Sequence, residues 1–491
     1  MESKKLVVSN KIDYKYEKDV FYIYSESKII KLTKKASSIF MNIIKGNLFL
    51  DEKMDNSLVD IIYKLLENQL VEYDDGDFIY KKNKYTVVFG FENNFFIVNF
   101  LYKTFDKLDA KTYEKFIANN FETMDIDERA YFIARRYIDT HDYDYKKYMC
   151  KSAYETIYIT FSYACNLKCT YCFEANNNKA SFMGKNIFEK TIKYIDDISK
   201  EKITKIVFYG GEPILLSNVN YIKDIMSRYE KHRNVFFEFI TNGTNLELVD
   251  DIIEKYKNKI SKLIITIDGT KYVHDSRRMY KNGEGTFYKI INSLKILNDR
   301  GIRVTIRVNI DKGNYDVQSE LLHILEMRLK NKKIIDIEYH RVEDKESGYS
   351  GVELIDMYLL VKEMKKKATI NIMWAEPLYG RLMEIEENKD GYPIIQKSYC
   401  NFENMHVIDP LGRISCCNEI NGDDLFFSRA NILEIKKMNY RPTCQNCDLW
   451  LLCYGGCNLY YRNMNIKGRN ACLKQDYIKV MEMFISDLMD K

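Results

Sequence analysis

The feature that most constrains this chain is a group of three cysteines, Cys165, Cys169 and Cys172. They come directly after residues 156–161, an apolar run typical of a buried strand. Three thiols at these spacings can bind three irons of one 4Fe-4S cluster, and no fourth cysteine lies nearby for the last iron, which is left open to another ligand. The alternative is a zinc site of three cysteines that a distant fourth residue completes. The cysteines therefore predict a metal centre at the C-terminal end of a strand.

Strand and helix patterns alternate from residue 151 to about residue 370. Helical spacing recurs in stretches such as 187–198 and 288–298. The predicted strands are 156–161, 204–209, 235–240, 263–267, 303–310 and 334–340. Six strand–helix units predict an α/β fold with a parallel sheet curled into a partial (β/α)6 TIM-like barrel, in which active-site residues lie at the C-terminal strand ends.

Residues suited to ligand binding follow these strands. Gly210, Gly211 and Glu212 come after the second strand; the glycines let the backbone approach a ligand, and the carboxylate can accept hydrogen bonds from an ammonium group. Two histidines, His274 and His340, could shuttle protons, although a hydrogen-bonded structural histidine is the commoner outcome. No general base is identifiable from the sequence.

Together these motifs resemble the signature of the radical S-adenosylmethionine (SAM) enzymes, with the aromatic Tyr171 before the last cysteine and Gly-Gly-Glu about 40 residues later. In that family the open iron binds SAM, and an electron from the cluster splits SAM into methionine and a 5′-deoxyadenosyl radical. The implied cofactor-binding residues are Tyr171; Gly210, Gly211 and Glu212 for the methionine amino group; Thr266 and Arg278 for the carboxylate; and Asn309 for the ribose.

The segment that carries Arg278 resembles one shared by the radical SAM enzymes that modify peptides. An arginine suits a carboxylate because its planar fork can bind both oxygens. Arg277 is a neighbour that could be confused with Arg278. For Asn242 and Asn309 the alternative is a polar residue that caps a strand end.

Seven further cysteines lie from residue 400 onward: Cys400, Cys417, Cys444, Cys447, Cys453, Cys457 and Cys472. The C-x2-C-x5-C-x3-C run within them could bind zinc by itself. The whole set, with Gly412, resembles the SPASM extension of radical SAM maturases, which holds two auxiliary 4Fe-4S clusters. The resemblance implies one cluster on Cys444, Cys447, Cys453 and Cys472, and another on Cys400, Cys417 and Cys457. The chain would then carry three 4Fe-4S clusters.

The second auxiliary cluster has three implied ligands, so one of its irons is predicted to be open unless the adjacent Cys416 binds it. An open iron could bind a substrate thiolate, because a soft iron–sulfur centre favours sulfur. This iron favours a thioether product, in which a peptide cysteine joins a carbon radical. The alternatives are a carbon–carbon cross-link or the conversion of cysteine or serine to formylglycine. Asn418 counts against formylglycine, since those maturases usually have an acidic residue there.

The N-terminal segment reads as a winged helix: a β-meander near 11–33, two helices, and a closing hairpin around Asp74 to Asp77. Residues 1–82 contain 14 lysines, 14 acidic residues and no arginine, so they lack a basic surface for nucleic acid. The order of elements resembles the precursor-recognition element of enzymes that modify ribosomally made peptides, where a leader peptide adds a strand to the meander. The alternatives are an accessory domain and a DNA-binding redox or metal sensor.

Composition sets the remaining expectations. Lysine plus arginine number 75 against 71 aspartate plus glutamate, so no nucleic-acid or membrane partner is predicted. Without a signal sequence or a membrane span the chain is expected in the cytoplasm, where twelve cysteines suggest metal ligands. A precursor peptide and an electron donor such as flavodoxin or ferredoxin are the expected partners. The predicted domains are 1–82, winged helix; 83–150, bridging region; 151–385, partial barrel; and 386–491, SPASM domain.

Overall fold

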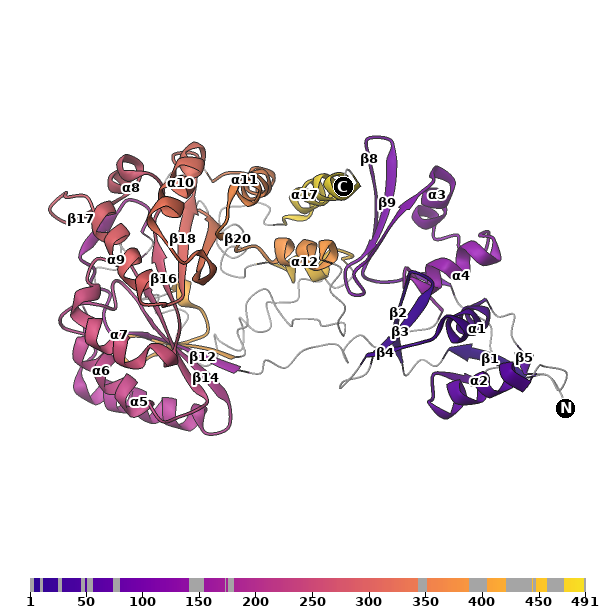
Figure 1. The fold of residues 1–491 in the computed structure, drawn as a ribbon, viewed down its shortest axis with the longest axis horizontal. Coiled ribbons are helices and arrows are strands. Elements are labelled where there is room, and N and C mark those ends of the chain that lie inside the picture. Colours follow the sequence, from indigo (N-terminus) through magenta and orange to yellow (C-terminus); the bar gives the residue numbers. More distant parts are fainter. Residues whose placement is uncertain are drawn as a thin grey trace.

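A computed structural model of the chain describes most of these regions. The described residues are 4–8, 12–24, 29–45, 49–50, 56–73, 80–140, 154–172, 174, 181–342, 351–387, 404–420, 444, 447–456 and 472–489. Figure 1 shows two groups of elements, with the parallel sheet and its helices on one side and the N-terminal elements on the other.

The largest sheet has nine strands, in the order β20-β19-β18-β16-β15-β14-β12-β21-β22. The six predicted strands are all present and consecutive in this sheet, where they pair in parallel as β12 (Tyr154–Thr160), β14 (Ile203–Tyr209), β15 (Val235–Thr241), β16 (Ile260–Thr266), β18 (Val304–Ile310) and β19 (Ile335–Arg341). The predicted parallel α/β sheet is thus confirmed. Three short strands, β20 (Asn371–Trp374), β21 (Met405–Ile408) and β22 (Ile414–Ser415), extend it beyond the prediction.

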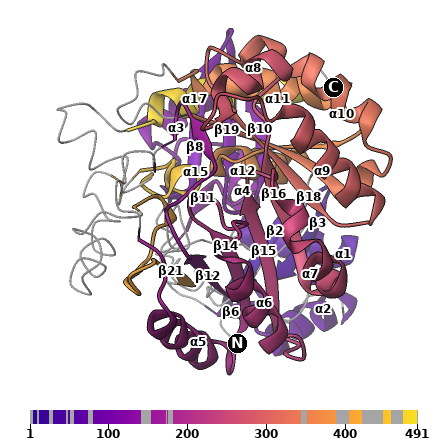
Figure 2. The ribbon, with the colours of Figure 1, turned by 90° about the vertical axis from the view of Figure 1, so that its left-hand side faces the viewer.

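Helices cover one face of this sheet, and Figure 2 shows them in an arc around the strands. They are α5 (Lys185–Ser199), α6 (Val219–Arg228), α7 (Asp250–Tyr256), α8 (Lys271–Arg277), α9 (Phe287–Asp299), α10 (Gln318–Arg328) and α11 (Leu354–Lys367). Alternate strand residues such as Ile157, Phe208 and Ile337 pack into the apolar core under these helices. Successive side chains of a strand point to opposite faces, so the residues between them lie on the other side of the sheet.

We call that other side the inner face. Its residues include Tyr158, Lys205, Tyr209, Lys262, Thr266, Arg307, Asn309, Glu338 and His340, each flanked along its strand by residues of the helix-side core. A face that carries this many charged and polar groups inside a barrel-like sheet is suited to binding a polar ligand.

The N-terminal elements form two small sheets and two helices. One sheet is the predicted meander, β2 (Asp13–Glu17), β3 (Val20–Tyr24) and β4 (Ile29–Lys31); the other has the order β5-β1-β6, with β1 (Lys4–Val8), β5 (Phe49–Leu50) and β6 (Val71–Tyr73). Helix α1 (Lys34–Ile44) begins where the Thr33 side chain accepts from the Ala36 N–H at 3.2 Å, and α2 is Asn56–Glu67. The predicted hairpin at Asp74 to Asp77 lies outside the described residues.

Residues 80–140 add the sheet β8 (Thr86–Phe91), β9 (Asn94–Asn99) and β10 (Thr104–Leu108), the strand pair β7 (Lys81–Lys82) and β11 (Ile138–Asp139), and helices α3 (Ala110–Ala118) and α4 (Ile126–Ala134). The two faces of β9 enter different cores. Ile97 packs with the N-terminal residues, whereas Phe96 and Val98 pack in the core that includes the barrel. This sheet therefore lies between the two groups of elements.

Three C-terminal helices complete the described chain: α12 (Pro377–Glu386), the short α15 (Trp450–Cys453) and α17 (Lys474–Met489). Buried residues of these helices, such as Leu382, Leu451 and Phe484, belong to the same apolar core as the barrel. Within the described residues, no helix is both long and apolar enough to pass through a lipid bilayer.

Candidate functional site

The three-cysteine loop lies at the C-terminal end of β12, as predicted. It contains the short strand β13 (Leu167–Cys169), which pairs antiparallel with β17 (Arg278–Tyr280), so that Cys169 lies opposite Arg278. The Thr170 N–H also donates to the Arg277 carbonyl at 2.9 Å. These backbone bonds hold the loop against the segment predicted to bind the SAM carboxylate.

The thiols of this loop influence one another. The pKa of Cys165 is raised to about 12 and that of Cys172 to about 11, mainly by burial and in part by charge on the neighbouring cysteines. Among the described residues, no three His, Cys, Asp or Glu side chains converge as they would around a single metal ion. A 4Fe-4S cluster binds each thiolate to a different iron and favours soft donors, and three neighbouring thiols are a soft donor set.

The backbone at Gly210 and Gly211 approaches the cysteine loop too closely for a side chain. A Cβ on Gly211 would lie 2.3 Å from the Ala164 carbonyl oxygen, and a Cβ on Gly210, where φ is +114°, would lie 2.5 Å from the Thr160 methyl carbon. The Glu212 N–H donates to the same Ala164 carbonyl at 2.9 Å. The two predicted motifs are therefore in direct contact.

Glu212 is buried, with 1% of its surface exposed. Its Oε1 accepts from the Ile214 N–H at 2.9 Å and the Thr241 hydroxyl at 2.6 Å, and its Oε2 accepts from the Asn242 N–H at 2.7 Å. Burial raises the pKa of Glu212, and these hydrogen bonds oppose that rise. Two carboxylate oxygens offer about four acceptor positions, so one position on Oε2 is left for a further donor such as an ammonium group.

Asn242 joins the carboxylate to the cysteine loop. Its side-chain amide donates to Asn166 Oδ1 at 2.8 Å and lies 3.8 Å from the Cys165 sulfur. Asn166 in turn donates to the Thr244 hydroxyl at 2.8 Å. Asn242 thus orders the loop. This is the strand-end capping role that was the alternative for Asn242 in the sequence.

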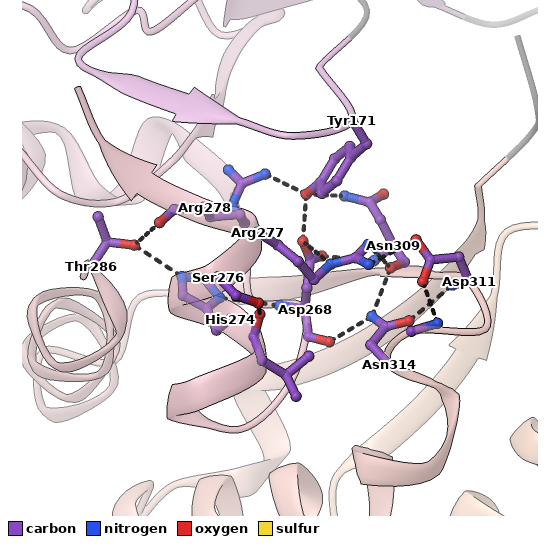
Figure 3. Close-up of polar contacts among 12 residues, drawn as sticks. Tyr171, Asp268, His274, Ser276, Arg277, Arg278, Thr286, Asn309, Asp311 and Asn314 are labelled. Atoms are coloured by element: carbon purple, nitrogen blue, oxygen red, sulfur yellow. Dashed lines mark hydrogen bonds and ion pairs between the residues drawn. The ribbon is translucent and has the colours of Figure 1, made fainter. Parts of the chain in front are cut away.

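Tyr171 is the centre of a second hydrogen-bond network, drawn in Figure 3. Its hydroxyl donates to Asp268 Oδ2 at 2.5 Å, and it accepts from Arg278 Nη1 at 2.6 Å and Asn309 Nδ2 at 3.1 Å. Three of the predicted cofactor-binding residues, Tyr171, Arg278 and Asn309, therefore meet at one hydroxyl group. Thr266 is buried at the end of β16, on the inner face.

The structure separates the roles of the two adjacent arginines. Arg277 Nη1 lies 2.7 Å from Asp311 Oδ2 and its Nε lies 3.5 Å from Asp268 Oδ2, while its Nη2 donates to the Asn309 carbonyl at 3.2 Å. Arg278 bonds to Tyr171 through Nη1, and its Nε is buried with no hydrogen-bond partner in the described part of the chain. Arg277 is thus occupied within the protein, whereas Arg278 keeps a buried donor for a ligand.

Asp268 was not predicted from the sequence as a site residue, although it lies at a strand end like the predicted residues. Asp268 is fully buried, and its Oδ1 accepts from the Asn309 N–H at 3.1 Å. Its carbonyl accepts from the side-chain amides of Asn314 at 2.6 Å and Gln318 at 3.2 Å. Its position directly after the fourth predicted strand was the signal that could have identified it as a site residue.

The two histidines have different environments. His274 is fully buried; its Nδ1 accepts from the Asp268 N–H at 3.2 Å and its Nε2 pairs with the Thr286 hydroxyl at 3.0 Å. Burial lowers its pKa to about 4, so it stays neutral. His274 is therefore a structural histidine, as Figure 3 illustrates. His340 lies on the inner face and bonds to Glu338 at 2.8 Å.

Cys444, Cys447 and Cys472 lie near enough to Cys453 for their charge to act on it. The pKa of Cys453 is raised to about 12, mainly by burial and in part by charge on Cys447, Cys444 and Cys472. Cys416 is buried and Cys417 is partly exposed after β22. The predicted ligands Cys400 and Cys457 lie outside the described residues.

Comparison with known proteins gives matches over this region. Residues 159–327 match the family model of the Radical SAM superfamily. The cysteine-type anaerobic sulfatase-maturating enzyme of Clostridium novyi (strain NT) is 31% identical over 159 residues, which are 30% of this chain and 41% of the relative. The antilisterial bacteriocin subtilosin biosynthesis protein AlbA of Bacillus subtilis (strain 168) is 27% identical over 154 residues, 31% of this chain and 32% of AlbA. The matches span less than half of either relative.

The fold also resembles a solved structure, that of native anSMEcpe with bound AdoMet. The TM-score is 0.52 at 18% identity, and the alignment covers 68% of this chain and 98% of the other. A similarity at this level of identity shows that the fold is shared.

Proposed function

Residues 159–327 form a radical SAM domain, and from this premise we propose that the chain modifies a ribosomally made precursor peptide, installing a cross-link that is a cysteine thioether. The observation that carries the proposal is the direct contact between the three-cysteine loop and the Gly210–Glu212 turn. The cysteine loop would bind the cluster and the Gly210–Glu212 turn would bind the ligand of its open iron, so the two motifs must be adjacent. Hydrogen bonds of Ala164 and Asn242 connect them.

We propose that Cys165, Cys169 and Cys172 hold a 4Fe-4S cluster, that Cys444, Cys447, Cys453 and Cys472 hold a second, and that Cys400, Cys417 and Cys457 hold a third. With SAM bound, the first of these clusters would supply the chemistry of a 5′-deoxyadenosyl radical, which would take a hydrogen atom from the peptide. The effect of charge on Cys444, Cys447 and Cys472, which raises the pKa of Cys453, supports the second set, since such an effect requires proximity.

The chain's own residues would orient SAM. Within the residues that the structure describes, Glu212 has one free acceptor position for the amino group, and Arg278 has a buried, unpartnered Nε for the carboxylate. Asn309 is fixed beside them because its amide donates to Tyr171. Thr266 shares the inner face with Asn309 and completes the proposed carboxylate site.

The thioether proposal is supported by the position of Cys417. The next residue, Asn418, accepts a hydrogen bond through its carbonyl from the Tyr209 hydroxyl at 3.4 Å, and Tyr209 is on the inner face. A cluster on Cys417 would therefore lie beside the face that a peptide would enter. Formylglycine formation is a second candidate because the relative from Clostridium novyi is a cysteine-type sulfatase-maturating enzyme.

The test uses anaerobically reconstituted protein with SAM, a reductant and the precursor peptide. We expect 5′-deoxyadenosine to form and the peptide to lose two hydrogen atoms, with a sulfur–carbon bond located by tandem mass spectrometry. A formylglycine product would replace the thioether proposal with the second candidate. SAM cleavage that never alters the peptide would refute peptide modification. Flavodoxin or ferredoxin is the proposed electron donor. This proposal is tested by repeating the reaction with either protein in place of the chemical reductant.

We further propose that the N-terminal elements bind the leader of the precursor along β4. The sheet order leaves β2 and β4 at the edges of the meander. Arg135 covers part of the β2 edge, since its Nη1 donates to the Tyr16 carbonyl at 3.0 Å. On β4, Ile29 is 44% exposed. The β4 edge is thus the better candidate for an added strand.

Replacing Lys31 with proline should weaken leader binding about tenfold, because one hydrogen bond to the added strand is lost. The Leu32 N–H donates to the Phe21 carbonyl of β3, and Lys31 lies opposite Tyr22. Because hydrogen-bonded and non-hydrogen-bonded pairs alternate in an antiparallel sheet, the Lys31 N–H points away from β3, toward the position of an added strand. Binding is measured by fluorescence anisotropy of a labelled leader. Lys31→Ala keeps the N–H and is expected to bind within about twofold of the wild type. Equal binding by both variants would exclude the β4 edge.

A further inference from the structure

His340 and Glu338 form a pair on the inner face that the proposed cofactor sites do not use. Both lie on β19, where Ile337 and Tyr339 point into the helix-side core. His340 is paired in register with Asn309 and Glu338 with Arg307, so the histidine is one row nearer the C-terminal strand ends. This row is also the level of Tyr171, to which Asn309 donates.

The hydrogen bond between the pair fixes the imidazole. His340 Nε2 lies 2.8 Å from Glu338 Oε2. The carboxylate accepts, so the proton is on Nε2 and the lone pair is on Nδ1. The His340 side chain is 27% exposed, unlike His274, which is fully buried with both nitrogens engaged. A neutral imidazole that is oriented by a carboxylate and reachable from outside is the arrangement of a general base.

The charged groups near the pair favour a neutral His340 and an ionised Glu338. Burial lowers the pKa of His340 and the Arg307 guanidinium lowers it further, while Glu338 and Glu419 raise it. Burial disfavours the ionised form of Glu338, but the hydrogen bond and charge of His340, with Arg307 and Lys262, lower its pKa to about 2. The imidazole is therefore neutral and the carboxylate ionised at physiological pH.

We propose that His340 Nδ1 is the base that takes the substrate proton during cross-linking, with Glu338 as its positioning residue. This inference rests on the proposed function. In thioether formation one peptide C–H and one S–H bond break and one C–S bond forms. The hydrogen atom of the C–H bond converts the 5′-deoxyadenosyl radical to 5′-deoxyadenosine. The proton of the S–H bond goes to His340, and the remaining electron goes to a one-electron acceptor of the iron–sulfur class.

The test compares His340→Gln with His323→Gln, which changes an exposed histidine of α10. We expect His340→Gln to lower product formation about 100-fold or more, the usual size of a general-base contribution. SAM cleavage, and deuterium transfer from labelled peptide to 5′-deoxyadenosine, should persist. His323→Gln should match the wild type. Full product formation by His340→Gln would overturn the inference, whereas a wild type that does not cleave SAM would overturn the proposed function instead.

A pH profile separates a base from a structural residue. Product formation by the wild type should fall as the pH drops through the lowered pKa of His340, because only the neutral imidazole accepts a proton. Glu338→Gln removes a group that raises this pKa, so the fall should move to lower pH. The small residual rate of His340→Gln should not show this fall. An identical acid limb in all three proteins would assign the titration to another group and contradict the proposal.

Discussion

Replacing Cys165, Cys169 and Cys172 together with alanine is expected to remove about four of about twelve irons and to abolish SAM cleavage. The three thiols are the proposed ligands of one cluster, and three alanines leave no soft donor in the loop. The two C-terminal cysteine sets are separate from this loop in sequence, so their iron should remain. Iron and sulfide content of the anaerobically reconstituted protein, measured alongside 5′-deoxyadenosine formation, checks both parts.

The matched control is Cys444→Ala/Cys447→Ala/Cys453→Ala, which also changes three cysteines. It too should lose about four irons, but it should retain the cluster that binds SAM, so titration with SAM should still perturb the spectrum of the remaining iron. If zinc, and little iron, were found at the C-terminal cysteines, the proposal of three clusters and the thioether chemistry would both have to be abandoned. If the first variant kept all its iron, the cysteine loop would not be a cluster site.

Arg277→Met is expected to destabilise the protein by about 3–5 kcal/mol, because removal of one partner leaves buried charges unpaired. Arg277 is 6% exposed and pairs with two carboxylates, Asp268 and Asp311, that are 0% and 1% exposed. Methionine fills a similar volume but carries no charge. Unfolding is followed by urea titration of the metal-free protein, where the transition of the barrel should move to a lower urea concentration.

Arg228→Met is the control for this change. Its ion pair with Asp196 is at the surface, where the two side chains are 51% and 33% exposed, and such pairs contribute at most about 1 kcal/mol. A second variant, Arg277→Met/Asp311→Asn, should recover part of the loss since it removes one unpaired charge. Equal effects of Arg277→Met and Arg228→Met would show that the Arg277 network is not a buried ion pair of the usual strength.

The sequence predicted the parallel strands well because apolar residues recur at alternate positions along segments of about seven residues, as in VTIRVNI of β18. It did not predict β20 and β21, since runs of four residues are too short to distinguish from a loop by periodicity. The same limit applied to the arginines. The sequence indicated Arg278 for the ligand and left Arg277 as a neighbour that could be confused with it, and only the positions of Asp268 and Asp311 show that Arg277 is already paired.

The candidate site was predicted in outline for a similar reason. Glycines and carboxylates at strand ends are visible in the sequence, because a turn requires them at fixed positions. The hydrogen bonds of Glu212 and Tyr171 are not, since they join residues about 30 to 140 positions apart. His340 could not be distinguished from His274 before the structure showed that one is on the inner face and the other in the core. The ligand roles of the cysteines remain predictions.

The sheet of β8, β9 and β10 bears on which residue of the precursor would be modified. Since Ile97 is packed in one core while Phe96 and Val98 are packed in the other, bending at this sheet would open apolar contacts on one of its sides. A leader bound along β4, as proposed, would then be held at a constant distance from the inner face. The enzyme would act as a ruler: the number of residues between leader and reaction position, more than the local sequence, would select the residue that is modified.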